Sequence, residues 1–370
     1  MKEKTERLIE KIDQKKAINF SGPEKTANVL KGIPVNRLPL LFARKNTSVP
    51  GVVYNLKDQF YDKEKMLYEQ LLEIDRCATA AFDASLCIRP NIGVILAPAV
   101  TGLKYEVFED KYPWTVSHLS KNEIMKLCSP EPEKSELFQR TMEYIGYFRE
   151  TIPDWIHIYL PDTQGPFDIA HLIYGNDIFY DVYDDSTFVH DLMSYSTELY
   201  ISMSRKLKEA VGEPLDACFH GQSRGRGIYM ANGGVRISED TPTLLSPDQI
   251  DEFVIPYVEK AFAPFNGGFV HFCGKNEVLL EKFLQLEPVR AVNLGQPEMY
   301  DFEQTMQMFI KYNKCFFAHW PKLQDETLGQ YLQRMKNATS NGTKNMLLHF
   351  QEDYYPDSSA EKVLEQWESE

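Results

Sequence analysis

Two residues with metal-binding side chains, His271 and Cys273, stand two positions apart in the segment Gly-Gly-Phe-Val-His-Phe-Cys-Gly at 267–274. The residues before Gly274 are typical of a β-strand, in which side chains at positions i and i+2 point to the same side. A thiolate and an imidazole directed at one point suit zinc, which in catalytic sites takes three protein ligands and keeps one position open. The pattern therefore predicts two zinc ligands and requires a third. A buried strand with a small apolar Cys and a hydrogen-bonded His remains the alternative.

Composition and charge narrow the class of protein. At 370 residues the chain exceeds the usual size of a single core, so it forms either two domains or one large barrel. The net charge of −14 disfavours nonspecific binding to nucleic acid or to anionic membranes. The charged N-terminus lacks the apolar segment of a signal peptide, and no later stretch approaches 18 apolar residues. We therefore expect a cytoplasmic protein whose six cysteines are free thiols.

The order of elements predicts repeated strand-helix units. Residues 1–30 are polar with helical periodicity and indicate an N-terminal helical extension, so that residues 31–370 form the main body. Strands are predicted at 38–43, 93–97, 155–160, 216–220, 269–272, 291–294, 315–318 and 346–350. Helices are predicted at 63–82, 135–151, 187–211, 246–262, 277–286, 302–312, 326–338 and 360–367.

The dense strand-helix pairs after residue 267 favour an α/β fold of the (β/α)8 TIM-barrel class, with a doubly wound open sheet as the alternative. Chemistry in such barrels lies at the C-terminal ends of the strands. Candidate residues at these ends are His271, Cys273, Asn293, His319, Glu352, Asp162 and Gln164. Cys315 lies at the opposite end of its strand and is interpreted as a core thiol.

Several segments resemble the uroporphyrinogen decarboxylase superfamily, which includes methyltransferases that use methylcobamide. They are Ser-Pro-Asp-Gln-Ile-Asp-Glu-Phe-Val-Ile-Pro-Tyr at 246–257, His-Phe-Cys-Gly at 271–274, Ala-Val-Asn-Leu-Gly at 291–295, Gln-Gly-Pro-Phe-Asp-Ile-Ala at 164–170, Pro-Val-Asn-Arg-Leu-Pro at 34–39 and Pro-Asp-Ser-Ser-Ala-Glu-Lys-Val at 356–363. The resemblance runs from about residue 30 to the end. It implies a single barrel whose mouth accepts a tetrapyrrole or the methylcobamide of a partner protein.

The resemblance also separates two chemistries. Decarboxylases of the superfamily carry an Arg-Gln-Ala-Gly-Arg-Tyr run after the first strand, whereas this chain has Phe-Ala-Arg-Lys-Asn-Thr at 42–47. That stretch keeps Arg44, which the resemblance makes a substrate-binding residue, but it lacks the second arginine, and Lys45 cannot replace a planar guanidinium fork. The methyltransferases instead use His-x-Cys and a later Cys to bind zinc. Aligning their closing segment with Pro356 and Asp357 places Glu352 where that Cys would stand.

The expected site therefore consists of zinc on His271, Cys273 and Glu352. Asp240, in the Ser-Glu-Asp-Thr-Pro segment at 238–242, is expected to polarise a substrate group or to orient the metal-bound His271. His319 is a further candidate for proton transfer, with a metal ligand or a structural hydrogen bond as its alternatives. Asp162, Gln164 and Asn293 are expected to line the pocket.

We expect a zinc-dependent methyltransferase that moves a methyl group from the methylated corrinoid of a partner corrinoid protein to a small-molecule acceptor, such as a thiol. A tetrapyrrole decarboxylase (a lyase) that relies on Arg37 or Arg44 is one alternative, and a non-catalytic corrinoid-binding barrel is another. The residues do not decide the oligomeric state, and a homodimer stays open.

Overall fold

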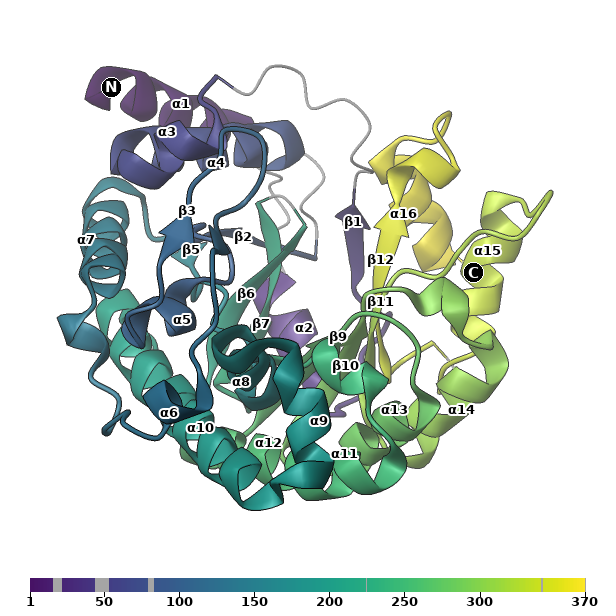
Figure 1. Cartoon of the computed structure of the whole chain (residues 1–370). Helices are drawn as coiled ribbons and strands as arrows, with labels where there is room; N and C mark the ends of the chain where they lie inside the picture. The colour runs from purple at the N-terminus through teal and green to yellow at the C-terminus, as the bar shows by residue number, and fades with distance from the viewer. Residues whose placement is uncertain (16–21, 44–52, 79–82, 224, 341, 370) are drawn as a thin grey trace.

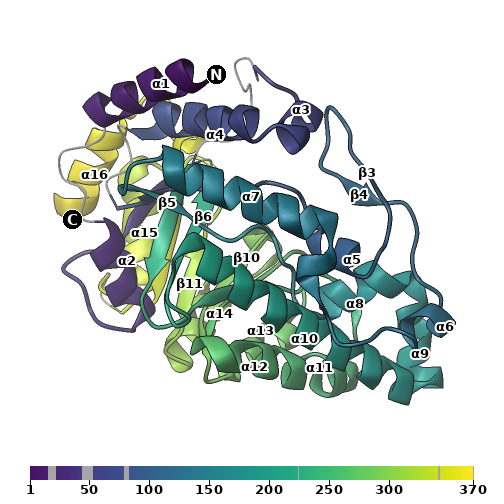
Figure 2. The same ribbon diagram turned by 90° about the vertical axis from the view of Figure 1, so that its left-hand side faces the viewer.

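A ring of helices encloses a central group of strands (Figure 1). This computed structural model describes residues 1–15, 22–43, 53–78, 83–223, 225–340 and 342–369. In Figure 2 the helices α4, α7, α10 and α12 follow one another down one side of the molecule, outside the strands. The layered arrangement of helices outside strands is that of a TIM-barrel-like α/β fold, as the sequence predicted.

The strands of the barrel belong to two sheets. The strands are β1 (Leu40–Ala43), β2 (Ser85–Ile88), β5 (Ile156–Ile158), β6 (Cys218–Ser223), β7 (Arg226–Met230), β8 (Val235–Ser238), β9 (Gly268–Phe272), β10 (Val289–Leu294), β11 (Cys315–Ala318) and β12 (Met346–Gln351), besides the short pair β3 (Tyr105–Glu106) and β4 (Trp114–Thr115). One sheet is parallel, in the order β1-β12-β11-β10-β9-β8. The other has the order β5-β2-β7-β6, and β7 runs antiparallel to both of its neighbours.

The helices of the described chain lie outside the strands (Figure 1). They are α1 (Lys2–Lys15), α2 (Gly22–Leu30), α3 (Leu56–Tyr61), α4 (Lys63–Cys77), α5 (Leu96–Val100), α6 (Lys121–Ile124), α7 (Glu136–Thr151), α8 (Pro166–Tyr174), α9 (Ile178–Asp184), α10 (Ser186–Val211), α11 (Pro247–Phe253), α12 (Ile255–Phe262), α13 (Glu277–Gln285), α14 (Phe302–Lys311), α15 (Leu328–Asn337) and α16 (Ala360–Ser369). In the part of the chain that the structure describes, none of them combines the length and hydrophobicity needed to cross a bilayer.

Two predicted elements differ from the structure. Residues 93–97, predicted as a strand, contain instead the start of α5, because a short buried apolar run fits a strand or a helix equally well. The single helix predicted at 246–262 is divided into α11 and α12 at Val254. Pro256 explains the break, since proline has no N–H to donate and its ring clashes with the carbonyl of residue 252. Ser246 is the N-cap of α11 and forms a capping box with Gln249.

Aromatic contacts and one buried arginine join the two sheets. His220 on β6 packs edge-on against Phe269 on β9, with ring centroids 4.9 Å apart. Arg226 on β7 donates to the carbonyl of Phe42 on β1. The side chain of Arg226 is 4% exposed and lies 3.6 Å from the carboxylate of Glu352, which follows β12. These contacts link the two sheets at separate places, from β6 to β9 and from β7 to β1 and to the end of β12.

Candidate metal centre and adjoining pocket

The parallel sheet brings three strand ends together at the candidate site. In the register of β8, β9 and β10, Ser238 and Asn293 are the Cα partners of His271. Parallel neighbours lie about 4.8 Å apart, so residues just beyond these positions share one end of the barrel. Asp240 lies in the turn after β8, and Cys273 directly follows β9.

Asp240, His271 and Cys273 form a group of metal-binding side chains in which the ligand atoms all lie within 4.8 Å of one another. Cys273 Sγ is 3.5 Å from His271 Nε2, so these two side chains do face the same side of β9. Asp240 Oδ1 is 3.8 Å from the same nitrogen and also accepts a 2.6 Å hydrogen bond from the backbone N–H of Cys273. One imidazole, one sulfur and one carboxylate therefore meet at one point.

The spacing of this group fits a tetrahedral zinc ion. Bonds of about 2.05 Å to nitrogen and about 2.3 Å to sulfur, at a tetrahedral angle, place those two ligand atoms about 3.6 Å apart. The observed separation of Sγ and Nε2 is 3.5 Å. The same geometry requires about 3.4 Å between nitrogen and a carboxylate oxygen, against the observed 3.8 Å from Nε2 to Asp240 Oδ1. The Asp240 carboxylate would have to move about 0.4 Å toward His271 Nε2 to reach that separation.

Asn293 orients the imidazole for this role. The side-chain amide of Asn293 donates from Nδ2 to the carbonyl of Phe317, which directs its Oδ1 toward His271. His271 Nδ1 lies 2.5 Å from that Oδ1 and must donate the proton, because Oδ1 can only accept. The lone pair of the neutral ring is then on Nε2, the atom that faces Cys273 and Asp240. A metal-binding histidine usually donates a hydrogen bond from its other ring nitrogen, which fixes the tautomer and the orientation of the ring.

The electrostatic surroundings shift the pKa values of the candidate ligands His271 and Cys273 in opposite directions. Burial, and then the charge of Arg236, lower the pKa of His271 to about 4, so the imidazole is neutral at neutral pH. Burial, and then the carboxylate of Asp240, raise the pKa of the Cys273 thiol to about 11. The apo site thus holds a neutral imidazole and a protonated thiol beside a carboxylate. A cation at the site would favour the thiolate.

Glu352, predicted as the third ligand, is not part of this group; Asp240 takes that place among the described residues. Glu352 follows β12, and β10 and β11 lie between β12 and β9 in the sheet. Its carboxylate faces Arg226, a buried cation that requires an anionic neighbour. Asp240, predicted to act on the substrate or on His271, lies in the position of a ligand.

The remaining predicted residues lie in different places. Asp162 and Asn293 line the pocket beside His271, as predicted, whereas Gln164 is not among the lining residues and donates from Nε2 to Asp162 Oδ1 at 2.6 Å. His319 is half-buried; burial lowers its pKa while Glu298 and Asp353 oppose that shift. It does not belong to the metal-binding group found among the described residues. Arg44 lies outside the described residues.

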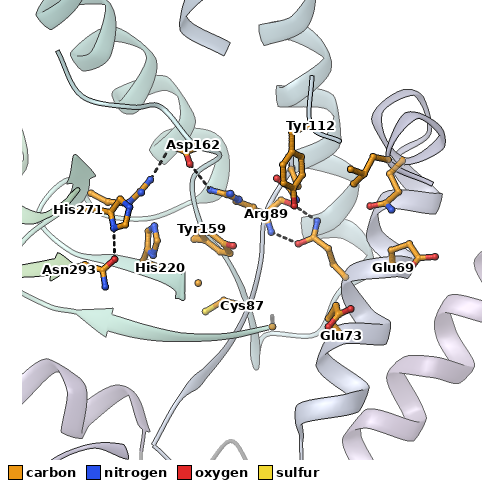
Figure 3. A pocket seen from close by; sticks show the side chains of 17 residues that line it. Glu69, Glu73, Cys87, Arg89, Tyr112, Tyr159, Asp162, His220, His271 and Asn293 are labelled. Atoms are coloured by element: carbon orange, nitrogen blue, oxygen red, sulfur yellow. Dashed lines mark hydrogen bonds and ion pairs between the residues drawn. The ribbon is translucent and has the colours of Figure 1, made fainter. Parts of the chain in front are cut away.

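A pocket of about 440 Å³ adjoins His271 and Asn293. Figure 3 shows these two side chains on one side of the pocket and Glu69 and Glu73 of α4 on the other, with Arg89 between them. The pocket therefore extends from the candidate metal centre to the inner face of α4.

Sequence reasoning missed several residues of the pocket wall, including Arg89, Arg236, Tyr159 and His220. Arg89 directly follows β2, a strand that was not predicted, and Arg236 lies on β8, also not predicted. The alternation Val-Arg-Ile-Ser at 235–238 was the available signal for β8.

Charged groups in the pocket form a buried network around Asp162. Arg236 Nη1 is 2.9 Å and Arg89 Nη1 is 3.8 Å from the Asp162 carboxylate. Burial alone would raise the pKa of Asp162, but Arg236 and Arg89 together hold it below its usual range. The Arg89 guanidinium also lies over the ring of Tyr159, 5.4 Å from its centroid. This network fixes two guanidinium groups beside the candidate metal centre.

Comparison with known proteins gives the fold a precedent. The sequence matches no protein-family model and no curated protein at a significant level. The structure is similar to that of a methyltransferase from Methanosarcina mazei, with a TM-score of 0.65 and 15% sequence identity, over 94% of this chain and 98% of the other. At this identity the likeness concerns the fold, so the chain has a methyltransferase-like barrel.

Proposed function

We propose that this protein is a zinc-dependent enzyme that transfers a methyl group from a methylated corrinoid, carried by a partner protein, to a thiol. The observation that carries the proposal is the convergence of Asp240 Oδ1, His271 Nε2 and Cys273 Sγ at one end of the barrel. Three ligands of this kind leave the fourth position of a tetrahedral ion open to a substrate, as in catalytic zinc sites. The methyltransferase-like fold supports the proposal.

A zinc ion held there would supply Lewis acidity, which lowers the pKa of a bound acceptor thiol toward neutral pH. The protein's own residues prepare the site. Asn293 keeps the lone pair of His271 on Nε2, and Asp240 is anchored through the N–H of Cys273. In the overall reaction, the sulfur–methyl bond forms as the carbon–cobalt bond breaks, its electron pair stays with the corrinoid, and the thiol proton passes to solvent.

The pocket beside His271 is the proposed binding site of the acceptor. Its wall contains Arg89 and Arg236, both held by Asp162, together with the ring of Tyr159. Side chains fixed by such contacts bind and orient a small molecule without reorganising. The pocket of about 440 Å³ lies in the usual size range of small-molecule sites.

The decarboxylase alternative is less well supported. Arg37, one of its two expected cationic residues, forms ion pairs with Asp83 and with Glu368. The guanidinium of Arg37 is therefore already paired with carboxylates near the start of β1. There Asp83 also accepts a hydrogen bond from the backbone N–H of Leu40.

Metal content and methyl transfer test the proposal together. The protein and its H271A and C273A variants would be purified without oxygen and assayed for zinc, and for demethylation of methylcobalamin with 2-mercaptoethanol as the thiol. We expect about one zinc per chain and thiol-dependent demethylation in the unaltered protein, and loss of both in the two variants. H190A and C128A are matched controls, because His190 lies on the outer helix α10 and Cys128 is exposed. Unaltered protein without zinc, or zinc retained in both site variants, would refute the proposal.

A further inference from the structure

The turn that carries Asp240 is tied to α8 by two buried carboxylates. Glu239 is 0% exposed and Asp168 is 4% exposed, although both are acidic. Each belongs to a different element: Glu239 follows β8, and Asp168 lies in the first turn of α8. Buried carboxylates are costly unless hydrogen bonds satisfy their oxygens, so their partners show what they do.

Each of the two carboxylates accepts hydrogen bonds from backbone N–H groups in the segment that carries the other. Glu239 accepts from the backbone N–H groups of Phe167 and Asp168, both at 3.1 Å. Asp168 in turn accepts from the N–H of Asp240 at 2.9 Å and from the N–H of Thr241 at 2.8 Å. Each acid thus caps the chain segment that carries the other.

The sequence permits this close approach at one position in particular. Gly165 is the N-cap of α8 and has no side chain that could cap the helix. A Cβ at this position would lie 2.5 Å from Glu239 Oε1. Glycine therefore leaves the space that Glu239 occupies, and Glu239 supplies the capping group that glycine lacks.

These contacts determine where Asp240 lies. Its backbone N–H is held by Asp168, and its side chain accepts from the N–H of Cys273 at 2.6 Å. The preceding N–H, that of Glu239, donates to the carbonyl of His271 at 2.8 Å. Asp240 is thus fixed between α8 and the end of β9, although Asp168 lies 72 residues away in the sequence.

We propose that Asp168, supported by Glu239, is the positioning residue that holds Asp240 in place as the third metal ligand. This inference rests on the metal centre of the proposed function. Asp168 does not touch the metal position; it acts through the backbone of Asp240. Outer groups of this kind affect metal affinity by about 10- to 100-fold.

The test compares zinc and cobalt(II) binding by the unaltered protein with binding by D168N and D83N. The D168N substitution keeps the shape of the side chain but presents an NH₂ group to one of the two N–H donors. Asp83 is a matched control, because it is also fully buried and accepts a backbone N–H, that of Leu40, away from the metal centre. Dissociation constants would be measured by competition with a chromophoric chelator, at a temperature where all three proteins are folded.

We expect D168N to bind zinc about 10- to 100-fold more weakly than the unaltered protein, and the visible spectrum of its cobalt(II) form to change. D83N should keep the affinity and the spectrum even where its melting temperature falls. If D168N does not fold, G165A disturbs the same contacts from the side of α8 without changing any charge, and it should weaken binding as well.

Equal zinc affinity in the unaltered protein and in folded D168N or G165A would overturn this inference while leaving the proposed metal centre intact. Absence of zinc binding by the unaltered protein would instead remove the proposed function, and this inference with it.

Discussion

Replacement of Asn293 tests whether the orientation of His271 matters for the metal. In N293A the imidazole loses the 2.5 Å hydrogen bond at Nδ1, so the ring can place its proton on Nε2 and can rotate. We expect zinc affinity to fall about 10- to 100-fold, which corresponds to about 1.4 to 2.8 kcal/mol. The carbonyl of Phe317 also loses the Asn293 donor, which costs up to about 3 kcal/mol of stability with or without metal.

N293D separates these two effects. An aspartate keeps an acceptor for His271 Nδ1 but cannot donate to the carbonyl of Phe317. We therefore expect N293D to lose stability as N293A does, yet to keep zinc affinity within about threefold of the unaltered protein, because a carboxylate is a common partner of a metal-binding histidine.

Thermal or urea unfolding with and without zinc measures both quantities. At free zinc one hundred times its dissociation constant, the unaltered protein should gain about 2.7 kcal/mol from the metal. A 10- to 100-fold weaker N293A site would gain only about 1.4 to 0.4 kcal/mol at the same zinc concentration. The reasoning is refuted if N293A gains as much as the unaltered protein, since the tautomer of His271 would then have no part in binding.

Two further predictions concern Glu352 and the pH dependence of metal binding. E352Q should keep zinc but lower the free energy of unfolding by up to about 3 kcal/mol, because Arg226 would lose its anionic neighbour; zinc lost from the folded variant would show that Glu352 is a ligand after all. Zinc binding should strengthen about tenfold per pH unit from about pH 6 to about pH 8. The cause is the single proton that must leave Cys273, whose pKa burial and Asp240 raise to about 11, whereas burial keeps His271, with a pKa of about 4, neutral throughout. Chelator competition at several pH values measures the slope, and a slope near zero would contradict this account.

The best predicted part of the fold was the run of strands from β9 to β12 in the parallel sheet. Strands β9, β10, β11 and β12 were found within one or two residues, because each is a short apolar run between polar helical segments. The strands β2, β7 and β8 were not predicted. Arg226 begins β7 and Arg236 lies within β8, and their charges are compensated by groups from distant parts of the chain, Glu352 and Asp162. No local pattern indicates such a partner.

The candidate site was predicted in part for the same reason. His271 lies on β9 and Cys273 directly follows it, and the two-residue period of an extended chain suffices to place them together, which the 3.5 Å separation confirms. Asn293 was expected near the site and lies beside His271 in the register of β10. Glu352 was chosen as a ligand from an alignment of the chain's last segment, and a linear alignment cannot show which strand ends are neighbours.

The sequence by itself determined the features that local periodicity sets, namely the strand-helix alternation and the shared direction of His271 and Cys273, and it left the choice between a barrel and a doubly wound sheet open. Only the tertiary structure decided which third residue joins them. Asp240 reaches the site because β8 is hydrogen-bonded to β9 and because Asp168, from another helix, holds the backbone of the turn. The physical reason is that a ligand set requires atoms within a few ångströms of one another, and strand order and distant hydrogen bonds set such distances, whereas spacing along the chain does not.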